Sequence, residues 1–306
     1  MNRKANNYRI LAEKLYLGGD LNKSVYLYKK ALENSEDIDT KVLLFFNLGV
    51  IYTELGKWSS AINMYKELLD LDPKYSHAYY QLGLLYEDID RLEDAKSYYK
   101  QAIEIASEES LSLYNLANIL DKEGNVEEAI SLYYKILKFD PFHSYTLNNL
   151  GAIYEQRGEY ELALEFLKNS IESYPNYYLA HFNIGVVYAA LGNIEESLNH
   201  YNIAKELKPD YEYSYLNLSA LYIDKKEYQK AIDILSEGIV FNKEAYDLYY
   251  NRACSYVIIN EFENALDDIE LALKLYPPLI EWIVWDDDFF LLRDKDRYLE
   301  IIKNYT

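Results

Sequence analysis

The sequence predicts an all-α solenoid of stacked helical hairpins, and three observations support that prediction. A pattern of 34 residues recurs without a break from residue 42 to residue 279, and a fixed period of this size is typical of solenoids. Positions 8 and 20 of every copy hold only Gly, Ala or Ser, and five of the six prolines fall at position 32. The copies are residues 42–75, 76–109, 110–143, 144–177, 178–211, 212–245 and 246–279.

The copy at residues 144–177 shows why each unit is expected to be a pair of helices. Leu147, Leu150, Gly151 and Tyr154 recur at i, i+3, i+4 and i+7, so they share one face of a helix. A second run of the same spacing begins at Ala163. The small residues at positions 8 and 20 let the two helices approach closely, because a larger side chain forced into such a contact costs roughly 1–3 kcal/mol.

Turn signals separate the two helices and end each copy. Position 15 holds residues that tolerate a left-handed backbone, with Lys226 as the exception. The residues at this position are Gly56, Asp90, Gly124, Gly158, Gly192, Lys226 and Asn260. Proline at position 32 ends the second helix, and Ser76, Ser110 and Ser144 are expected to be the N-caps of the next first helix.

The combined pattern is Leu at position 7, a small residue at 8, Tyr at 11, Ala at 20, Tyr at 24 and Pro at 32. It resembles the tetratricopeptide repeat (TPR) family over residues 42–279. The resemblance implies a right-handed TPR superhelix that serves as a non-catalytic scaffold for protein–protein interaction. It also implies that positions 2, 5, 6, 9, 12 and 13 of the first helix line a concave groove.

The two ends of the chain depart from the regular pattern. Residues 5–38 form a degenerate first repeat with a polar opening at residues 2–7, and residues 39–41 separate it from the regular array. Residues 280–306 are expected to form capping helices, so that residues 1–306 make a single solenoid. Trp282 and Trp285 in this tail could belong to the cap alone or could dock a partner. Arg252, a charge at position 7, could reach the surface or pair with a carboxylate.

Composition limits the partners and the location of the chain. The formal net charge is −20, which argues against nucleic acid and anionic membranes and favours a basic partner. The single cysteine excludes an intrachain disulfide. From the sequence we expect neither a signal peptide nor a membrane span, and therefore a cytoplasmic protein.

A carboxamide occupies position 6 in all seven regular copies. Because a carboxamide both donates and accepts hydrogen bonds, the row predicts contacts to the backbone of an extended peptide. The alternative is that Asn is simply common at this position of the family. The row consists of Asn47, Gln81, Asn115, Asn149, Asn183, Asn217 and Asn251.

Position 5 places aromatic rings beside this row. They are predicted either to pack against ligand side chains or to pack against the adjacent repeat. The rings are Phe46, Tyr80, Tyr114, Phe182 and Tyr250, while Asn148 and Leu216 are the exceptions.

Positions 12 and 13 change character along the chain. They are mostly acidic in the early repeats, at Glu54, Glu87, Asp88, Asp121 and Glu155, and mostly apolar in the later ones. This split suggests a ligand with a basic and a hydrophobic segment, although solvated acidic residues would give the same pattern. Positions 2, 5, 6 and 9 hold no Lys or Arg, so no clamp for a C-terminal carboxylate, such as that of a chaperone tail, is expected.

Catalytic and cofactor motifs are missing from the sequence. It contains no phosphate-binding loop, no nucleophile motif and no cysteine pair, and its four histidines lack metal-ligand spacing. We therefore expect neither an enzyme nor a cofactor. The main alternative to peptide binding is a structural or homo-oligomeric role that uses the repeat ends or the convex surface.

Overall fold

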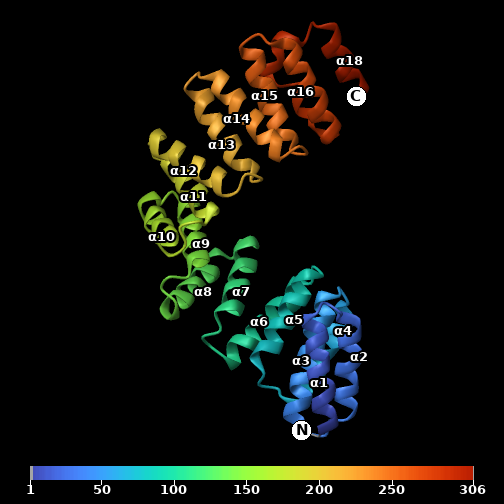
Figure 1. Cartoon of the computed structure of the whole chain (residues 1–306). Coiled ribbons are helices and arrows are strands. Elements are labelled where there is room, and N and C mark those ends of the chain that lie inside the picture. The colour runs from blue at the N-terminus through green and yellow to red at the C-terminus, as the bar shows by residue number, and fades with distance from the viewer. Residues whose placement is uncertain (1–2, 306) are drawn as a thin grey trace. The chain divides into compact units, whose positions relative to one another are not determined.

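The computed structural model describes residues 3–305 (Figure 1). Within that range the chain forms eighteen α-helices and two 3₁₀ helices and has no strand, so the predicted all-α class is confirmed. None of the described helices is both long and apolar enough to span a bilayer. Asn2 of the expected N-terminal cap and Thr306 of the expected C-terminal cap lie outside the described residues.

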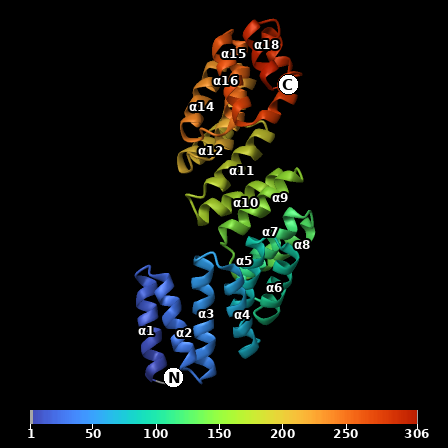
Figure 2. The same cartoon turned by 90° about the vertical axis from the view of Figure 1, so that its right-hand side faces the viewer.

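The chain divides into two compact units between Pro141 and Phe142. The first unit contains four helical hairpins, and Figure 2 shows its first four helices side by side in a row. The hairpins are α1 (Arg3–Leu17) with α2 (Leu21–Glu33), α3 (Ile38–Glu54) with α4 (Trp58–Leu71), α5 (Ser76–Asp88) with α6 (Leu92–Ile105), and α7 (Ser110–Lys122) with α8 (Val126–Phe139).

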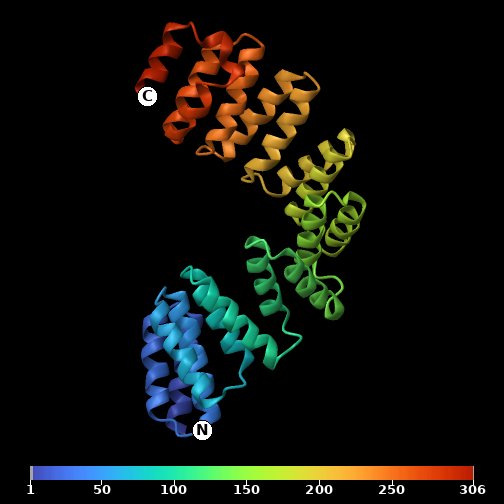
Figure 3. The same cartoon turned by 180° about the vertical axis from the view of Figure 1, so that it is seen from behind.

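The second unit contains four further hairpins and a short tail. The hairpins are α9 (Ser144–Gln156) with α10 (Tyr160–Ser173), α11 (Tyr178–Ala190) with α12 (Ile194–Leu207), α13 (Glu212–Asp224) with α14 (Tyr228–Phe241), and α15 (Tyr246–Ile258) with α16 (Phe262–Leu275). The tail consists of η1 (Pro277–Leu279), α17 (Ile280–Ile283), η2 (Asp287–Leu292) and α18 (Asp296–Tyr305). Figure 3 shows α18, at the red end of the chain, beside the last hairpin.

Close approach of the paired helices explains the small residues at position 8. A Cβ atom on Gly83 would lie 2.4 Å from Cε1 of Tyr99, the position 24 residue of the same hairpin. Tyr99 is fully buried, as are the equivalent Tyr65 and Tyr133. The tyrosine ring therefore fills the space that glycine leaves, and the tight contact predicted from the sequence is confirmed.

Serine replaces alanine at position 20 in two hairpins without leaving its hydroxyl unpaired. Ser24 donates to the carbonyl oxygen of Ala12 at 2.8 Å, and Ser197 donates to that of Gly185 at 2.7 Å. In both cases the acceptor is the position 8 residue of the facing helix. A small hydroxyl thus fits a contact that otherwise takes only a methyl group.

The predicted turn at position 15 is present in all eight hairpins. Five glycines there have positive φ, and so do Asp90 (58°), Asn260 (63°) and Lys226 (60°). Lysine has no special tolerance for this backbone, and a left-handed residue other than glycine costs roughly 1–2 kcal/mol. Two hydrogen bonds at the end of α13 accompany this conformation of Lys226, one from its own amide to the carbonyl of Ile223 and one from the amide of Glu227 to that of Tyr222, each at 2.8 Å.

Two expectations about helix starts were wrong. Ser110 and Ser144 are the first residues inside their helices, as is Ser76, and the N-cap is the residue before each. Glu109, for example, is the N-cap of α7, and its carboxylate accepts a hydrogen bond from the amide of Ser112, three residues later, at 2.8 Å. Residues 39–41 do not separate two repeats but lie in the first turn of α3, which Asp37 caps.

The C-terminal tail covers the end of the last hairpin. Buried tail residues share one apolar core with α15 and α16, and they include Ile283, Phe289, Leu292, Tyr298 and Ile301. The side chain of Arg297 on α18 pairs with Glu263, Asp267 and Glu270 of α16. Apolar packing and an exposed ion network together hold the tail in place.

Candidate functional site

The seven carboxamides of position 6 share one environment. Each lies on the first helix of its hairpin, and each side chain is partly exposed, neither buried in the core nor fully solvated. The adjacent position 7 residues are buried in the first six regular repeats. The carboxamide row therefore marks the edge between the helix interface and solvent.

In the first unit the carboxamides differ in their partners. Asn47 has no hydrogen-bond partner among the described residues. Gln81 lies 3.4 Å from Nε2 of His77, one helical turn earlier. Asn115 donates to the hydroxyl of Tyr99, in the preceding repeat, at 3.3 Å. The first two are thus available to a ligand, and the third also links two repeats.

In the second unit three carboxamides form a chain. Asn183 donates from Nδ2 to Oδ1 of Asn148 at 2.9 Å, and Asn148 donates from its own Nδ2 to Oδ1 of Asn149 at 3.2 Å. Asn148 is buried. The chain therefore links two neighbouring repeats and holds both outer carboxamides in fixed orientations.

The last two carboxamides bond to their own helices. Asn217 donates to the carbonyl of Tyr213 at 2.9 Å, and Asn251 donates to that of Asp247 at 2.8 Å. Asn217 also accepts from the hydroxyl of Tyr201, in the preceding repeat, at 3.3 Å. The amide groups are therefore oriented by the chain, and several of them also tie one repeat to the next.

The position 5 rings pack on the interior with one face. Phe46, Tyr80, Tyr114 and Phe182 each lie beside the position 24 tyrosine of the same hairpin, with centroids 5.4–6.3 Å apart. Tyr250 packs instead against Phe289 of the tail, at 5.7 Å. All five remain partly exposed. This packing lies within one hairpin, and Phe46 also contacts His77 of the next repeat, with the centroids 5.4 Å apart. Whether the rings serve mainly a ligand or the adjacent repeat stays a prediction.

The hairpin at residues 144–177 lacks this aromatic pair. Asn148 stands at position 5, and Leu167 stands at position 24. With no tyrosine hydroxyl to reach the next repeat, the Asn148–Asn183 hydrogen bond supplies the link. Both departures from the pattern are visible in the sequence, but their connection is visible only in the fold.

The acidic residues at position 12 are affected by burial or by hydrogen bonding within the chain. Burial raises the pKa of Asp121 in the first unit and of Glu155 in the second. The carboxylate of Glu87 accepts a hydrogen bond from the hydroxyl of the buried Tyr99 at 2.9 Å. Partly buried carboxylates of this kind favour a cation nearby.

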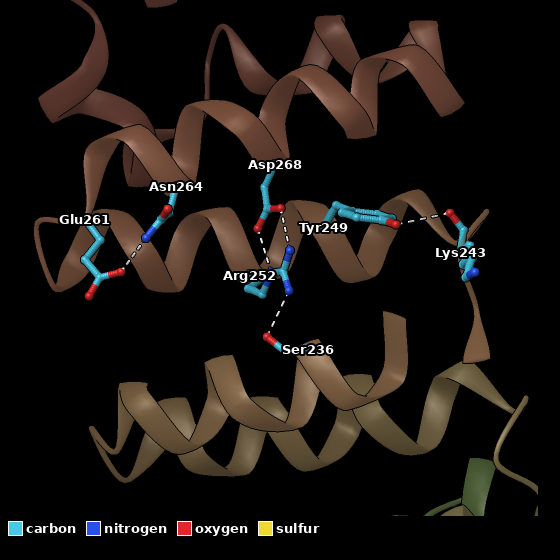
Figure 4. Close-up of polar contacts among 7 residues, drawn as sticks. All are labelled: Ser236, Lys243, Tyr249, Arg252, Glu261, Asn264 and Asp268. Carbon is cyan, nitrogen blue, oxygen red and sulfur yellow. Dashed lines mark hydrogen bonds and ion pairs between the residues drawn. The ribbon is translucent and has the colours of Figure 1, made fainter. Parts of the chain in front are cut away.

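Sequence reasoning left the role of Arg252 open, and the structure resolves it. Its guanidinium donates to both carboxylate oxygens of Asp268, each at 2.7 Å, and to the hydroxyl of Ser236 at 2.9 Å (Figure 4). The side chain of Asp268 is 3% exposed. The buried ion pair therefore links the two helices of the last hairpin, and the hydrogen bond to Ser236 joins that hairpin to the preceding repeat. Asp268 is the only acid at position 23, a signal that could have revealed the pair.

Two histidines with unrelated repeat positions come together in the second unit. His181 donates from Nε2 to the carbonyl of Pro175 at 3.0 Å, so its Nδ1 is left to accept from Nδ1 of His200 at 3.1 Å. Burial lowers the pKa of His181, and burial with the nearby His181 lowers that of His200 to about 4. The neutral pair is a packing element.

One group of three side chains has the spacing of a metal site. The ligand atoms of Cys254, Asp286 and Asp288 lie within 4.8 Å of one another. Asp286 already accepts hydrogen bonds from the hydroxyl of Tyr250 and the amide of Asp288. Burial, with the two carboxylates nearby, raises the pKa of the Cys254 thiol. The contacts within the chain thus account for this cluster, and we assign no metal to it.

Sequence reasoning also missed a pocket at the start of the last hairpin. It has a volume of about 570 Å³ and includes Glu212, Asp247, Phe241 and Tyr246 in its lining. Burial raises the pKa of both carboxyls, and Asp247 raises that of Glu212 further. The repeat pattern of the sequence gives no signal for this pocket, because the pocket forms where the end of one repeat meets the start of the next.

Family models place the chain among known repeat proteins. Models described as tetratricopeptide repeat match residues 76–109, 108–176, 148–212 and 246–278, and one described as TPR repeat matches residues 49–90. Every one of these models describes a repeat, and none describes an enzyme. No curated protein sequence matches the chain.

Solved structures of the same fold cover most of the chain. A tetratricopeptide repeat protein from Parabacteroides merdae superposes with a TM-score of 0.62 and 19% identity, covering 87% of this chain and 98% of that one. PilW, a type IV pilus biogenesis factor, gives a TM-score of 0.57 and 17% identity, covering 65% and 92%. YrrB, a TPR protein with an unusual peptide-binding site, gives 0.50 and 22%, covering 65% and 97%.

Proposed function

Because this chain belongs to the tetratricopeptide repeat family, we propose that it is a non-catalytic scaffold that binds an extended segment of a protein partner. The binding surface is the first-helix face of the regular repeats, which the family presents as a concave groove. The similarity in fold to YrrB, a TPR protein with an unusual peptide-binding site, supports a role of this kind. The first unit contributes Asn47, Gln81 and Asn115 to this surface, and the second contributes Asn149, Asn183, Asn217 and Asn251.

The single observation behind this proposal is the carboxamide row. All seven members are partly exposed on the first helices, and most are held in place by hydrogen bonds within the chain. An oriented amide loses less entropy on binding than a mobile side chain does. A row of oriented carboxamides can pair with the N–H and C=O groups of a peptide regardless of its side chains.

Charge narrows the partner to a segment with basic residues. The net charge of −20 attracts cations at long range. Burial raises the pKa values of Asp121 and Glu155 because it disfavours their charged forms. A basic side chain bound beside them would stabilise those charged forms. A C-terminal carboxylate, a nucleic acid and an anionic membrane all have the wrong charge for this surface.

The test is a peptide selected from a random display library against the whole chain. Isothermal titration calorimetry then compares its affinity for the wild type with that for Asn47→Ala and Gln81→Ala, two carboxamides that make no inter-repeat hydrogen bond. Asn63→Ala on α4 is the control, since Asn63 is exposed outside the row. Each lost hydrogen bond should weaken binding about two- to tenfold, corresponding to roughly 0.5–1.5 kcal/mol.

A second set examines the other unit. Asn149→Ala and Asn251→Ala are compared with Asn199→Ala, an exposed residue of α12. Unchanged affinity in both sets would overturn the carboxamide face as the binding site. If sedimentation velocity also showed a mass that rises with concentration, the chain would be a self-assembly module instead.

A further inference from the structure

Two tryptophans of the C-terminal tail are the most exposed large aromatic residues of the described chain. Trp282 is 72% exposed and Trp285 is 82% exposed, whereas Trp58 is 37% exposed. A tryptophan has a large apolar area that is normally buried. The apolar core of the tail is made by other residues, such as Ile283 and Phe289. Capping alone therefore does not explain these two rings.

The two rings border a pocket on the last repeat. The pocket has a volume of about 410 Å³, and we call it the Trp282–Trp285 pocket. Its lining consists of Tyr250, Glu281, Trp282, Trp285 and Asp286. Aromatic rings and carboxylates are thus its only components.

The inner wall of the Trp282–Trp285 pocket is held rigidly. The hydroxyl of Tyr250 donates to the carboxylate of Asp286, and its ring packs at 77° to that of Phe289, with the centroids 5.7 Å apart. Asp286 also caps η2 by accepting from the amide of Asp288 at 2.9 Å. The backbone amides of Trp285 and Asp286 both bond to the carbonyl of Trp282. These contacts hold Tyr250, Asp286 and the backbone at Trp285 in place, while the two indole rings stay exposed.

The charge of this pocket is negative and uncompensated. No cationic side chain lines it, and Glu281 forms no ion pair among the described residues. The guanidinium of Arg293 donates to the backbone carbonyl of Asp286 at 3.1 Å and lies 3.6 Å from the carboxylate of Asp287. It therefore leaves the carboxylates of Glu281 and Asp286 free of a cationic partner.

We propose that the Trp282–Trp285 pocket binds an arginine or lysine side chain of a protein partner, an inference that rests on the proposed scaffold function. A cation is attracted to the negative face of an aromatic ring, and tryptophan gives the strongest attraction. The two carboxylates add a hydrogen-bonding end for the guanidinium or ammonium group. Tyr250, at position 5 of the last repeat, connects the pocket to the carboxamide face at Asn251.

Fluorine NMR of the whole chain labelled with 5-fluorotryptophan tests this directly. The three tryptophans give three signals, which Trp→Phe variants assign. The probe is acetyl-Gly-Arg-Gly-amide, with the lysine and glutamine tripeptides for comparison. We expect the arginine peptide to shift the signals of Trp282 and Trp285 in a saturable way and to leave that of Trp58 unchanged. The glutamine peptide should shift none of them.

Charge-neutral variants separate the pocket from general attraction to an acidic protein. Trp285→Ala should weaken binding of the arginine peptide at least about threefold, although the net charge is unchanged, while Trp285→Phe should retain part of the affinity. Phe142→Ala, which removes another exposed ring, is the control and should have no effect. Equal shifts from the arginine and glutamine peptides, or no shift of either tail signal, would overturn the proposal.

Removal of one carboxylate gives a second readout at equal net charge. Glu281→Gln should weaken binding of the arginine peptide about two- to fivefold, whereas Glu172→Gln, at an exposed site on α10, should not. Failure of this pocket is distinguishable from failure of the scaffold. A selected peptide that needs the carboxamides but ignores Trp285→Ala overturns only the pocket, and the reverse result overturns only the carboxamide face.

Discussion

The repeats at residues 76–109 and 246–279 have the same backbone pattern but fill the space between their helices differently. In the first, the fully buried ring of Tyr99 lies under Gly83. In the second, Ile269 stands at the position of Tyr99, and the Arg252–Asp268 ion pair occupies the neighbouring positions. Tyr99 receives a hydrogen bond from the following repeat, whereas Arg252 donates one to the preceding repeat.

This difference shows two ways to fill positions 7, 8, 23 and 24. The aromatic set pairs Gly83 with Tyr99, although the next hairpin has Ala117 with a buried Tyr133 at the same positions, and the ionic set needs Arg252 and Asp268 together. A single substitution in either set leaves a clash or an unpaired charge, while a matched substitution does not. Changes within one set should therefore be strongly non-additive.

The largest effect is expected for Arg252→Leu. This change leaves the carboxylate of Asp268 buried without its guanidinium partner. Loss of one member of a buried ion pair costs about 3–5 kcal/mol of unfolding free energy. Urea denaturation followed by circular dichroism measures the loss.

The matched control is the double variant Arg252→Leu/Asp268→Leu. It installs the residue types that the repeat at residues 110–143 carries as Leu116 and Leu132. Replacement of a whole buried ion pair by apolar residues is often neutral or stabilising, so the double variant should recover most of the stability. A double variant as unstable as the single one would show that the pair is not interchangeable with an apolar solution.

The second effect concerns the glycine of the aromatic set. In Gly83→Ala the new Cβ would meet the Tyr99 ring at 2.4 Å, and such overpacking costs about 1–3 kcal/mol of unfolding free energy. In the Tyr99→Ile background, which copies the pairing of Ala253 with Ile269, the same change should be neutral or stabilising, because alanine favours a helix by roughly 1 kcal/mol over glycine. Urea denaturation of the four proteins measures the coupling, and additive effects would refute the set.

The fold was predictable because it depends on periodic features. Small residues at positions 8 and 20, the turn at position 15 and proline at position 32 each have a local physical reason, and each recurs in register. The contacts of the carboxamide row were not predictable in the same way. The partner of Asn115 depends on Tyr99 in the preceding repeat, and that of Asn183 depends on Asn148. Such pairings are fixed by the stacking of hairpins, which no spacing within one repeat encodes.

The C-terminal tail shows more clearly which features could not be predicted from the sequence. Residues 280–305 have no repeat, so the sequence predicted helices there but no pocket. The lining of the Trp282–Trp285 pocket combines the tail with Tyr250, more than thirty residues earlier. Trp282 lies in α17 and Trp285 in the turn that follows it, and the geometry of that turn follows from tertiary packing.

A third test concerns His200, which occupies position 23 of the repeat at residues 178–211, the position that Asp268 holds in the last repeat. Burial holds its pKa at about 4, below the ordinary value of 6.5. The unfolded chain therefore binds a proton more readily, and stability is full above pH 6.5 and falls as the pH drops from 6.5 toward 4. Since the ring is only partly buried, we expect a loss of about 1–2 kcal/mol, less than the full shift implies.

His200→Phe, which copies Phe166 of the preceding repeat, should flatten this part of the pH profile. Urea denaturation at pH 7 and at pH 4.5 gives the difference for the variant and the wild type. The groups that face His200 are His181, Lys168, Glu196 and Tyr188. His77→Gln, in the first unit, is the control for removal of any histidine. A profile that stays equally steep in His200→Phe would assign the dependence to another group.

The smallest expected effect is the loss of a tyrosine hydroxyl, and it should differ between a hydroxyl that links two repeats and one that does not. Tyr99→Phe removes the hydrogen bonds to Glu87 and Asn115 and should cost about 0.5–1.5 kcal/mol of unfolding free energy. Tyr65 is the matched residue, because its buried hydroxyl has no hydrogen-bond partner among the described residues, and the nearby Thr53 hydroxyl donates instead to the carbonyl of Gly49 at 3.0 Å. Tyr65→Phe should therefore be neutral or slightly stabilising in the same urea titration. If both variants lost equal stability, the hydroxyl of Tyr99 would contribute nothing as a link, and the ring alone would account for its place in the repeat.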